Sequence, residues 1–439
     1  MNLEVEWSRG DHVEIAQQTL GELRGDGEPL VFDEGALCRY QPATGLWKAV
    51  DLAAQSCVIQ RFAGAVVKGE GKPKPLKIHA GDVTGSIKLA HDQAAKPGFF
   101  ADGRPGIAFA NGFVKVSAKS IVTHPHAPDN RARYGYSFWY KDAVAGPMFL
   151  KFLHSLFRDD GDREEKISLL QEFWGASLLG IATKYQRAVI AQGDGENGKN
   201  ALADVMMAAF PPDAVAALAP QHFESEYRRA MLAGKRINVV SELPEAEIIA
   251  SESFKAIVTG DMIDGRHIRE APFNFRAVAG HFFCANELPG TADQTPGFWR
   301  RFLVVTFKRS FRDDPERDPY IARKIIDKEL PSIVAWMIVG AQRLMREGVY
   351  TIPSSHYAAM TAWQAAANPV ASFLAEEARD AADGEAGTPA AILYNRFRNW
   401  CSTNGHKPMS SAKFGRRMRL LNKGSKSDGT ARMHPVVLT

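Results

Sequence analysis

The chain has little cysteine and no long apolar run. Its four cysteines, Cys38, Cys57, Cys284 and Cys401, lie far apart in 439 residues, without the close spacing of a zinc site or a disulfide scaffold. Such usage is typical of a reducing compartment. No apolar stretch approaches membrane-spanning length, and the N-terminus has no apolar signal region. We therefore expect a cytoplasmic protein with no membrane partner.

Strong net charge and internal repeats are also missing. The formal net charge is +4, and the 45% hydrophobic and 24% charged residues are ordinary for a globular protein. The length indicates about three domains. The average charge hides a basic region, because ten Lys and Arg stand between Arg396 and Arg432 against the single acid Asp428. A local basic footprint of this kind is typical of nucleic-acid binding.

A glycine-rich loop is the most informative segment. The apolar run 188–191 predicts a strand, a helix-prone stretch begins near Asn200, and Lys199 stands between them. Such a loop lets backbone N–H groups and a helix N-terminus converge on phosphate oxygens, while the lysine reaches the β- and γ-phosphates. Asn200 stands where Ser or Thr normally holds magnesium. The expected ATP-binding residues are Gly193, Asp194, Gly195, Glu196, Asn197, Gly198, Lys199, Asn200 and Ala201.

The same glycines admit a dinucleotide site as the alternative. Gly193, Gly195 and Gly198 fit that fingerprint, which requires an acid about 20 residues on, at the end of a second strand. Asp213 is near that position, but it follows two prolines, which cannot close a central parallel strand. The dinucleotide motif also has no use for the lysine. The pattern therefore favours a phosphate loop.

Two later apolar strands end in polar residues that ATP hydrolysis needs. The strand 236–240 leads to Ser241 and Glu242, and the strand 281–285 leads to Asn286. Hydrolysis requires an acid, a polar group that orients water and a positive charge on the γ-phosphate. Glu245 or Glu247 could replace Glu242 as the acid. A surface glutamate and a turn-forming asparagine are the plainer alternatives for these positions.

A pair of arginines supplies the candidate positive charge. Arg300 and Arg301 follow Phe298 and Trp299 and precede the apolar stretch 302–307. An arginine here fits a finger that acts on a neighbouring subunit's nucleotide, and such a finger contributes about 10³ to 10⁵ in rate. A solvated turn is the alternative.

Strands that alternate with helices predict an α/β core with a parallel sheet whose faces are covered. Strands are expected at 30–40, 46–50, 188–191, 237–240, 280–285 and 302–307, a hairpin at 106–116, and helices at 12–23, 146–179, 200–210, 319–348, 365–381, 393–400 and 413–421. We divide the chain into an α/β N-terminal region (1–145), a helical linker (146–183), an ATPase core (184–312), a helical extension (313–350) and a basic C-terminal domain (351–439).

Five motifs in order resemble a known family. They are Gly-x-Gly-x-Asn-Gly-Lys at 193–199, Val-Val-Ser-Glu at 239–242, Phe-Lys-Ala-Ile-Val-Thr-Gly-Asp at 254–261, Ala-Asn-Glu-Leu-Pro at 285–289 and Phe-Trp-Arg-Arg at 298–301. The set is similar to the primase-helicase ATPases of phages, plasmids and poxviruses, which are superfamily III helicases of the AAA+ class. Segments at 106–112, 121–127, 330–348 and 393–415 extend the resemblance over roughly residues 30 to 435.

The resemblance implies an AAA+ P-loop core, a winged-helix-like C-terminal domain and a role for each motif. Lys199 would bind the β- and γ-phosphates of ATP, Glu242 would hold Mg²⁺ and polarise water, and Asn286 would orient that water. Arg300 or Arg301 would be the finger in a homo-oligomeric, usually hexameric, ring. Asn200 is the second expected Mg²⁺ ligand, because an amide oxygen can bind a hard cation.

The family translocates on single-stranded DNA, so single-stranded and forked DNA are the implied partners. The implied DNA contacts are a channel hairpin with Arg266, His267 and Arg269, and the C-terminal residues Lys413, Arg416, Arg417 and Arg419. Since the sequence has no evident primase domain, a separate primase or polymerase is a further expected partner, in the cytoplasm of a bacterial host.

The resulting hypothesis is an ATP-dependent, ring-forming DNA helicase for replication of a phage or mobile element. Two departures from the wider pattern, Asn200 and a single carboxylate at Glu242, support an alternative. In that alternative the protein is a DNA-binding initiator or scaffold that assembles with ATP but unwinds little or nothing. A nucleotide-dependent regulator without a DNA role is the third possibility, and the basic tail argues against it.

Overall fold

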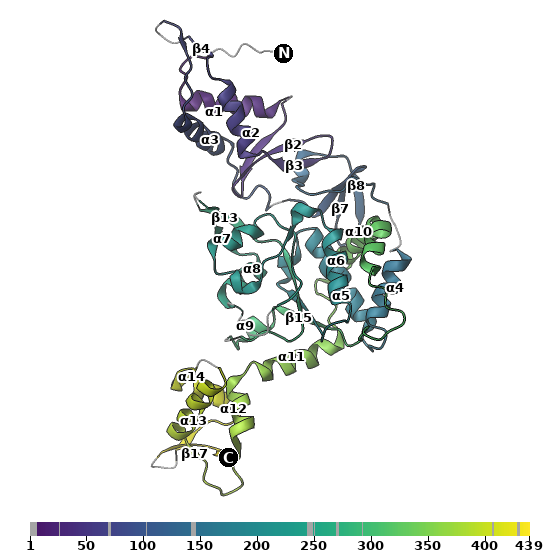
Figure 1. Cartoon of the computed structure of the whole chain (residues 1–439), viewed down its shortest axis with the longest axis vertical. Helices are drawn as coiled ribbons and strands as arrows, with labels where there is room; N and C mark the ends of the chain where they lie inside the picture. The colour runs from purple at the N-terminus through teal and green to yellow at the C-terminus, as the bar shows by residue number, and fades with distance from the viewer. Residues whose placement is uncertain are drawn as a thin grey trace.

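The computed structural model describes residues 7–25, 27–68, 72–101, 103–141, 146–243, 249, 251–268, 272–291, 293–405, 408–427 and 431–439. Figure 1 shows an elongated molecule with the N-terminal elements at one end, a central α/β body, and a small C-terminal module carried beyond it by a single helix. Within these ranges no helix is both long enough and apolar enough to cross a bilayer.

The N-terminal region contains three helices and three small antiparallel sheets. Asp11 caps the first helix by accepting a hydrogen bond from the Glu14 backbone N–H at 2.8 Å, which satisfies one of the donors left open at a helix start. The hairpin expected at 106–116 is confirmed. The elements are α1 (His12–Arg24), β1 (Leu30–Asp33), β2 (Ala36–Gln41), β3 (Leu46–Ala49), α2 (Leu52–Arg61), β4 (Val66–Val67), β5 (Lys74–Pro75), α3 (Ala80–Ala94), β6 (Gly106–Phe109), β7 (Gly112–Val116) and β8 (Ile121–His124).

The central sheet has the strand order β10-β11-β14-β9-β15, and every neighbouring pair is parallel. Its strands are β9 (Ala188–Gln192), β10 (Val215–Ala216), β11 (Ile237–Val240), β14 (Gly280–Ala285) and β15 (Phe302–Thr306). The expected strands at 188–191, 237–240, 280–285 and 302–307 are confirmed, whereas the two-residue β10 at the sheet edge was not predicted. The parallel sheet expected from the sequence is confirmed.

Both faces of this sheet are covered. On one face Val189, Phe282 and Leu303 belong to a core shared with α4 (Pro147–Leu156), α5 (Arg163–Leu178), α6 (Lys199–Ala209) and α10 (Ile321–Glu347). On the other face Ile190 and Val304 pack with α8 (Ser251–Thr259), α9 (Pro296–Trp299) and α11 (Ser354–Ala366). Two buried faces explain why these strands read as continuous apolar runs in the sequence.

Close helix packing behind the sheet depends on two glycines. A Cβ added at Gly175 of α5 would overlap the backbone of α10 at Met337, and one at Gly340 of α10 would overlap the backbone of α5 at Gln171. The two helices therefore approach each other where only glycine fits. The extension expected at 319–348 is one continuous helix, with Pro331 inside it.

The helix expected at 365–381 is wrong in its bounds. Two helices occupy this region, α11 and α12 (Pro369–Glu377), and a short strand β16 (Ala378–Asp380) follows. Pro369 cannot continue a preceding helix, and it disfavours helical backbone at Asn368. The Asn368 side chain accepts a hydrogen bond from the Val370 backbone N–H at 3.2 Å and so starts the second helix.

The C-terminal module packs three helices against small antiparallel sheets. Phe373, Leu393, Phe397, Trp400 and Phe414 form its buried core, which confirms the helical spacing expected at 393–400. Its remaining elements are α13 (Ala390–Thr403), α14 (Ser411–Leu420), β17 (Thr388–Pro389), β18 (Lys426–Ser427), β19 (Arg432–His434) and β20 (Val436–Leu438).

A hairpin and several short helices complete the central body. The hairpin pairs β12 (Met262–Gly265) with β13 (Phe273–Arg276) in antiparallel register. The others are α7 (Glu226–Arg229) and the 3-10 helices η1 (Pro128–Asn130), η2 (Ala182–Tyr185), η3 (Pro212–Ala214), η4 (Pro220–His222) and η5 (Ala230–Leu232).

Candidate functional site

The glycine-rich loop joins the end of β9 to the start of α6, as the sequence predicts. Gly195 and Gly198 have φ angles of 93° and 79°, a left-handed conformation that glycine adopts without strain. A Cβ at Gly193 would overlap the Asn197 side chain and the Phe307 carbonyl. No side chain caps α6, so its first N–H groups remain available to an anion.

Lys199 is 5% exposed and lies at the centre of the site. Its Nζ donates to the Gly193 carbonyl at 2.6 Å and to Asn286 Oδ1 at 2.8 Å. Burial lowers the pKa of Lys199, while the nearby Cys284, Asp194 and Glu242 act in the opposite direction. The structure therefore brings together the loop lysine and the polar residue after β14.

A cleft of about 300 Å³ opens above this lysine, lined by the loop from Gly195 to Ala201 together with Ser241, Glu242 and Asn286. Glu242 and Asn286 are exposed. They meet the loop because the carboxyl ends of all the parallel strands lie on the same side of the sheet. The predicted acid, polar residue and phosphate loop thus share one cleft, although β14 separates β11 from β9.

Oxygen donors for a cation are present but sparse. Asn200 and Glu242 both line the cleft. In the described ranges, no group of three or more His, Cys, Asp or Glu side chains could hold a metal by itself. This donor set fits Mg²⁺, which keeps several waters and is usually held by one or two protein oxygens plus substrate phosphates. Glu245 and Glu247, the alternative acids, lie outside the described residues.

Basic residues after β15 surround the loop and were not predicted. Glu196 accepts a hydrogen bond from Arg312 Nε at 2.6 Å and lies 3.4 Å from Arg317. The Arg312 bond is the main reason that the pKa of Glu196 is lowered. The side chain of Glu196, in the loop, therefore points to arginines of the same chain. The run of charged residues that follows β15 is the signal that could have indicated them.

An apolar cavity of about 680 Å³ adjoins the phosphate loop. It shares Glu196, Gly198 and Ala201 with the cleft. Its apolar lining consists of Met148, Phe152, Phe311, Pro319 and Ile321. The volume lies within the range of small-molecule sites. The sequence could not predict this cavity, because its walls come from separate segments that only the fold brings together.

Arg300 and Arg301 lie at the amino-terminal ends of the sheet strands, whereas the loop lies at their carboxyl ends. The Arg301 carbonyl accepts a hydrogen bond from Ala188 N at 2.7 Å, beside the first residue of β9. The loop follows the last residue of that strand, so about 15 Å separates them at ~3.3 Å per residue. Arg300 is exposed, whereas Arg301 is 8% exposed and donates to the Gly297 carbonyl.

The dinucleotide alternative is wrong, because its required acid is not at the end of a strand. Asp213 lies in η3, immediately before β10. It therefore precedes the strand, whereas the fingerprint needs an acid at the strand's carboxyl end.

The candidate DNA residues lie on the hairpin and on α14. Arg266, just after β12, lies 3.9 Å from the Glu226 carboxylate, and the His267 ring stacks on Phe273 at 5.2 Å. Arg269 lies outside the described residues. On α14, Lys413, Arg416 and Arg419 are exposed. Arg417 differs from the prediction, because it is 7% exposed and so lies off the exposed basic face.

A buried lysine lies behind the loop. Lys166 is fully buried, and its Nζ donates to Asp160 Oδ2 at 2.8 Å and to the Thr306 carbonyl at 2.8 Å. Asp162 Oδ1 is 3.5 Å away. The carbonyl of Phe307, the residue immediately after β15, accepts a hydrogen bond from the loop residue Asn197 at 3.4 Å. Lys166 therefore supports the strand end that contacts the loop.

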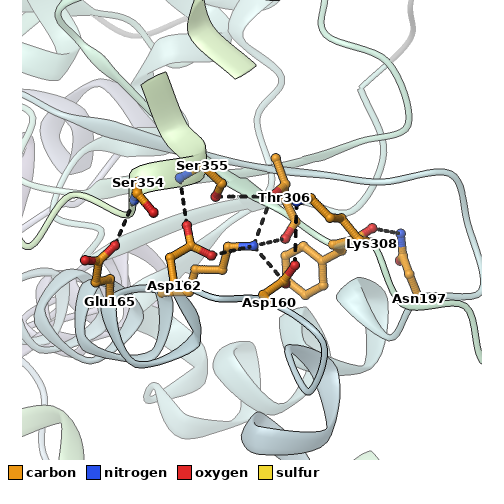
Figure 2. Close-up of polar contacts among 10 residues, drawn as sticks. Asp160, Asp162, Glu165, Asn197, Thr306, Lys308, Ser354 and Ser355 are labelled. Atoms are coloured by element: carbon orange, nitrogen blue, oxygen red, sulfur yellow. Dashed lines mark hydrogen bonds and ion pairs between the residues drawn. The ribbon is translucent and has the colours of Figure 1, made fainter. Parts of the chain in front are cut away.

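The same group of residues reaches the start of α11 (Figure 2). Asp162 accepts a hydrogen bond from Ser355 N at 2.8 Å, and Glu165 accepts one from Ser354 N at 2.7 Å. The Thr306 hydroxyl lies 3.3 Å from the Ser355 hydroxyl. Polar contacts thus continue from the phosphate loop to the helix that leads to the C-terminal module.

Two segments of the chain match known families. Residues 191–301 match a family of unknown function, DUF5906, and residues 365–425 match the family described as poxvirus D5 protein-like. The first match contains the phosphate loop and the strand-end residues, and the second contains α13 and α14. No curated protein matches the chain.

Two solved structures of one protein region are similar to this chain at low sequence identity. The apo structure of the NrS-1 C terminal region has 12% identity and a TM-score of 0.48, and covers 98% of this chain and 99% of that chain. The A form apo structure of the same region has 12% identity and a TM-score of 0.46, and covers 83% and 78%.

Proposed function

We propose that this protein is an ATPase that acts in DNA replication, as a ring-forming DNA helicase of a phage or mobile element. The observation that carries the proposal is the contact of Lys199 Nζ with Asn286 at 2.8 Å, in a cleft that Glu242 also lines. Phosphate, acid and water-orienting groups are the parts that phosphoryl transfer requires. The poxvirus D5-like match of residues 365–425 supports a replication role.

In this proposal the contacts of Lys199 change when ATP binds. Without nucleotide, its ammonium group bonds to Gly193 and Asn286. Phosphate oxygens would replace these acceptors, because a charge-assisted bond to phosphate is stronger. Asn286 would then be released to orient the attacking water, which Glu242 polarises. Mg²⁺, held by Glu242, Asn200 and phosphate oxygens, would neutralise charge on the phosphates.

The apolar cavity gives the nucleoside a place beside the phosphates. It adjoins the loop at Gly198 and Ala201 and has the volume for a purine nucleoside.

The exposed Arg300, at the amino-terminal ends of the strands, would act on a neighbouring subunit's nucleotide. The distance of Arg300 from the loop of its own chain favours a site that a second copy of the chain completes, as the resemblance to AAA+ helicases implies.

Removal of the loop lysine tests the proposal. We expect Lys199→Ala to lower DNA-stimulated ATP hydrolysis and unwinding of a forked DNA by at least 10²-fold, because the substitution removes the cation that holds the transferred phosphate. Lys328→Ala, on the exposed face of α10, is the control and keeps both activities. Normal unwinding by Lys199→Ala would show that the site is assigned incorrectly.

Asn200 favours a second candidate, the initiator or scaffold that uses ATP only to assemble on DNA. The loop normally has a hydroxyl at this position to bind magnesium. If Asn200 limits turnover, wild-type protein will assemble on DNA with ATP without measurable hydrolysis, and Asn200→Thr will gain hydrolysis. ATP turnover and unwinding by the wild-type chain would instead exclude the scaffold.

A further inference from the structure

A small, strongly basic cavity lies at the amino-terminal ends of the sheet strands, away from the phosphate loop. Its volume is about 50 Å³, and its lining joins the N-terminal region, at Glu34 and Asn130–Arg133, to the central body, at Gly180 and Arg236. Arg104 and Lys184, which also line it, are exposed. The basic lining therefore continues to the protein surface.

Basic side chains predominate in the described lining of this cavity. Arg133 is paired with Glu34, whose carboxylate lies 2.7 Å away, and its guanidinium stacks over the Phe100 ring at 4.4 Å. Arg131 lines the same space and donates to the Phe99 carbonyl at 2.8 Å. Glu34 is the only carboxylate among the cavity-lining residues that the structure describes. Arg104, Lys184 and Arg236 are the other basic residues of the lining.

Arg236 lines the same cavity, and no described carboxylate forms an ion pair with it. No side-chain hydrogen bond joins its guanidinium to any residue in the described part of the chain, and its contact is the Tyr134 ring at 5.8 Å. A Cβ at Gly180 would overlap this guanidinium, so a glycine is needed beside it. Burial, and next the charge of Arg133, lower the pKa of Arg236 to about 10.

A second donor faces the same space. Asn130 is 6% exposed and lines the cavity, and its side-chain amide makes no hydrogen bond to another described residue. Buried amides and guanidinium groups without partners are costly, and native proteins normally satisfy them with a ligand, water or ion. A ligand here must accept hydrogen bonds and carry negative charge.

We propose that this cavity binds a phosphate group. The guanidinium fork matches phosphate oxygens in a bidentate manner, and arginine cannot lose its proton in the physiological range. The space exceeds what one water needs, about 10 to 15 Å³, and is too small for a nucleoside. Its two sources are inorganic phosphate and a backbone phosphate of a nucleic acid that enters past Arg104 and Lys184. The proposal does not depend on ATPase activity.

The first test measures stabilisation by inorganic phosphate. It uses the full chain with Lys199→Ala, so that the phosphate loop contributes little, and chloride maintains constant ionic strength. We expect phosphate to raise Tm, and Arg236→Met to weaken the apparent affinity by at least tenfold. Asn130→Ala should weaken it in the same direction. Arg346→Met, at an exposed arginine of α10, is the matched control and retains the full shift.

Without phosphate, Arg236→Met should leave Tm equal or higher, because it removes a partly buried charge that forms no ion pair with a described residue. An arginine with a purely structural role would instead lower Tm, and this outcome would contradict the proposal. An equal phosphate shift in Arg236→Met and Arg346→Met would also overturn it.

Binding of a single-stranded oligonucleotide distinguishes the two sources. If a backbone phosphate occupies the cavity, Arg236→Met will weaken binding and reduce the salt-dependence slope by about 0.7. If inorganic phosphate occupies it, oligonucleotide binding will be unchanged while the phosphate shift is lost. Because these readouts are binding measurements, they remain informative even if the protein hydrolyses no ATP.

Discussion

Arg300 and Arg301 are neighbours in the chain with opposite surroundings. The side chain of Arg300 is exposed, and Arg301 is buried with a hydrogen bond to the Gly297 carbonyl. Burial lowers the pKa of Arg301, and the charge of Arg300 acts in the same direction. Arg300 can therefore reach a second molecule, whereas Arg301 is held by the preceding helix, α9.

We accordingly expect Arg300→Ala to lower ATP hydrolysis by about 10³-fold with little change in ATP binding, because a finger acts on the transition state of a neighbouring site. Mixing measures this directly. Arg300→Ala chains keep an intact loop, Lys199→Ala chains keep an intact finger, and a mixture should recover part of the activity that each lacks. Mixtures as inactive as the separate variants would contradict a shared site.

At this scale the sequence predicts the residues of the cleft but not their surroundings. Glu242, Asn286 and Lys199 could be predicted because each stands at a strand end or in a glycine-rich loop, and the local pattern marks both. The burial of Arg301 and Arg417 could not be predicted, because it depends on which helix face packs inward. The same applies to the pairing of Glu196, since its partners come from a distant segment.

At the scale of elements, one lysine links several parts of the core. Lys166 of α5 contacts the end of β15, at Thr306, and the acids Asp160 and Asp162 that precede α5. Asp162 in turn holds the start of α11 through Ser355. These groups are buried, so each charge depends on the others for compensation.

Lys166→Met should therefore destabilise the protein by about 3 to 5 kcal/mol, because it removes the buried cation that Asp160 and Asp162 share and leaves Asp160 only the exposed Lys308, 3.8 Å away. Urea unfolding at pH 7 measures the loss. Lys328→Met, on the solvent face of α10, should change stability by less than about 0.5 kcal/mol. Adding Asp160→Asn to Lys166→Met should restore part of the stability. A loss below about 1 kcal/mol would mean that solvent compensates these acids.

Element types were predictable wherever the apolar pattern was long and regular. The strands β9, β11, β14 and β15 read as apolar runs because both faces are buried. The break at Asn368–Pro369 was missed because the apolar pattern continues across it. The edge strand β10 was missed because two residues carry no pattern. The strand order could not be predicted, since β14 enters between β9 and β11 through long-range pairing.

At the scale of the whole molecule, stability should depend on two buried histidines. Burial lowers the pKa of His281 to about 3 and that of His356 to about 4. His356 Nδ1 accepts a hydrogen bond from Val304 N at 3.0 Å, which requires the neutral ring. The folded pKa values lie below the unfolded value of about 6.5. The stability they contribute is therefore complete above pH 6.5 and is lost as the pH falls.

Between pH 6 and 5 we expect each histidine to lower the free energy of unfolding by about 1.4 kcal/mol per pH unit, since the unfolded chain takes up the proton first. Urea unfolding across this range measures the slope. His356→Gln, which removes one titrating group and keeps an acceptor, should make the slope shallower by about that amount. The same slope in both proteins would show that His356 is protonated in the folded state.

The C-terminal module should supply electrostatic affinity for single-stranded DNA. Lys413, Arg416 and Arg419 are exposed on α14, at the end of the molecule opposite the N-terminal region (Figure 1). Replacing the three with Gln should reduce the slope of log affinity against log salt by about 2, because each phosphate contact on a single strand contributes about 0.7. Neutralising Arg323, Lys328 and Arg346, which are exposed on α10, is the matched control and should preserve the slope. If both triple variants bind an oligothymidylate with the wild-type salt dependence, DNA does not contact α14.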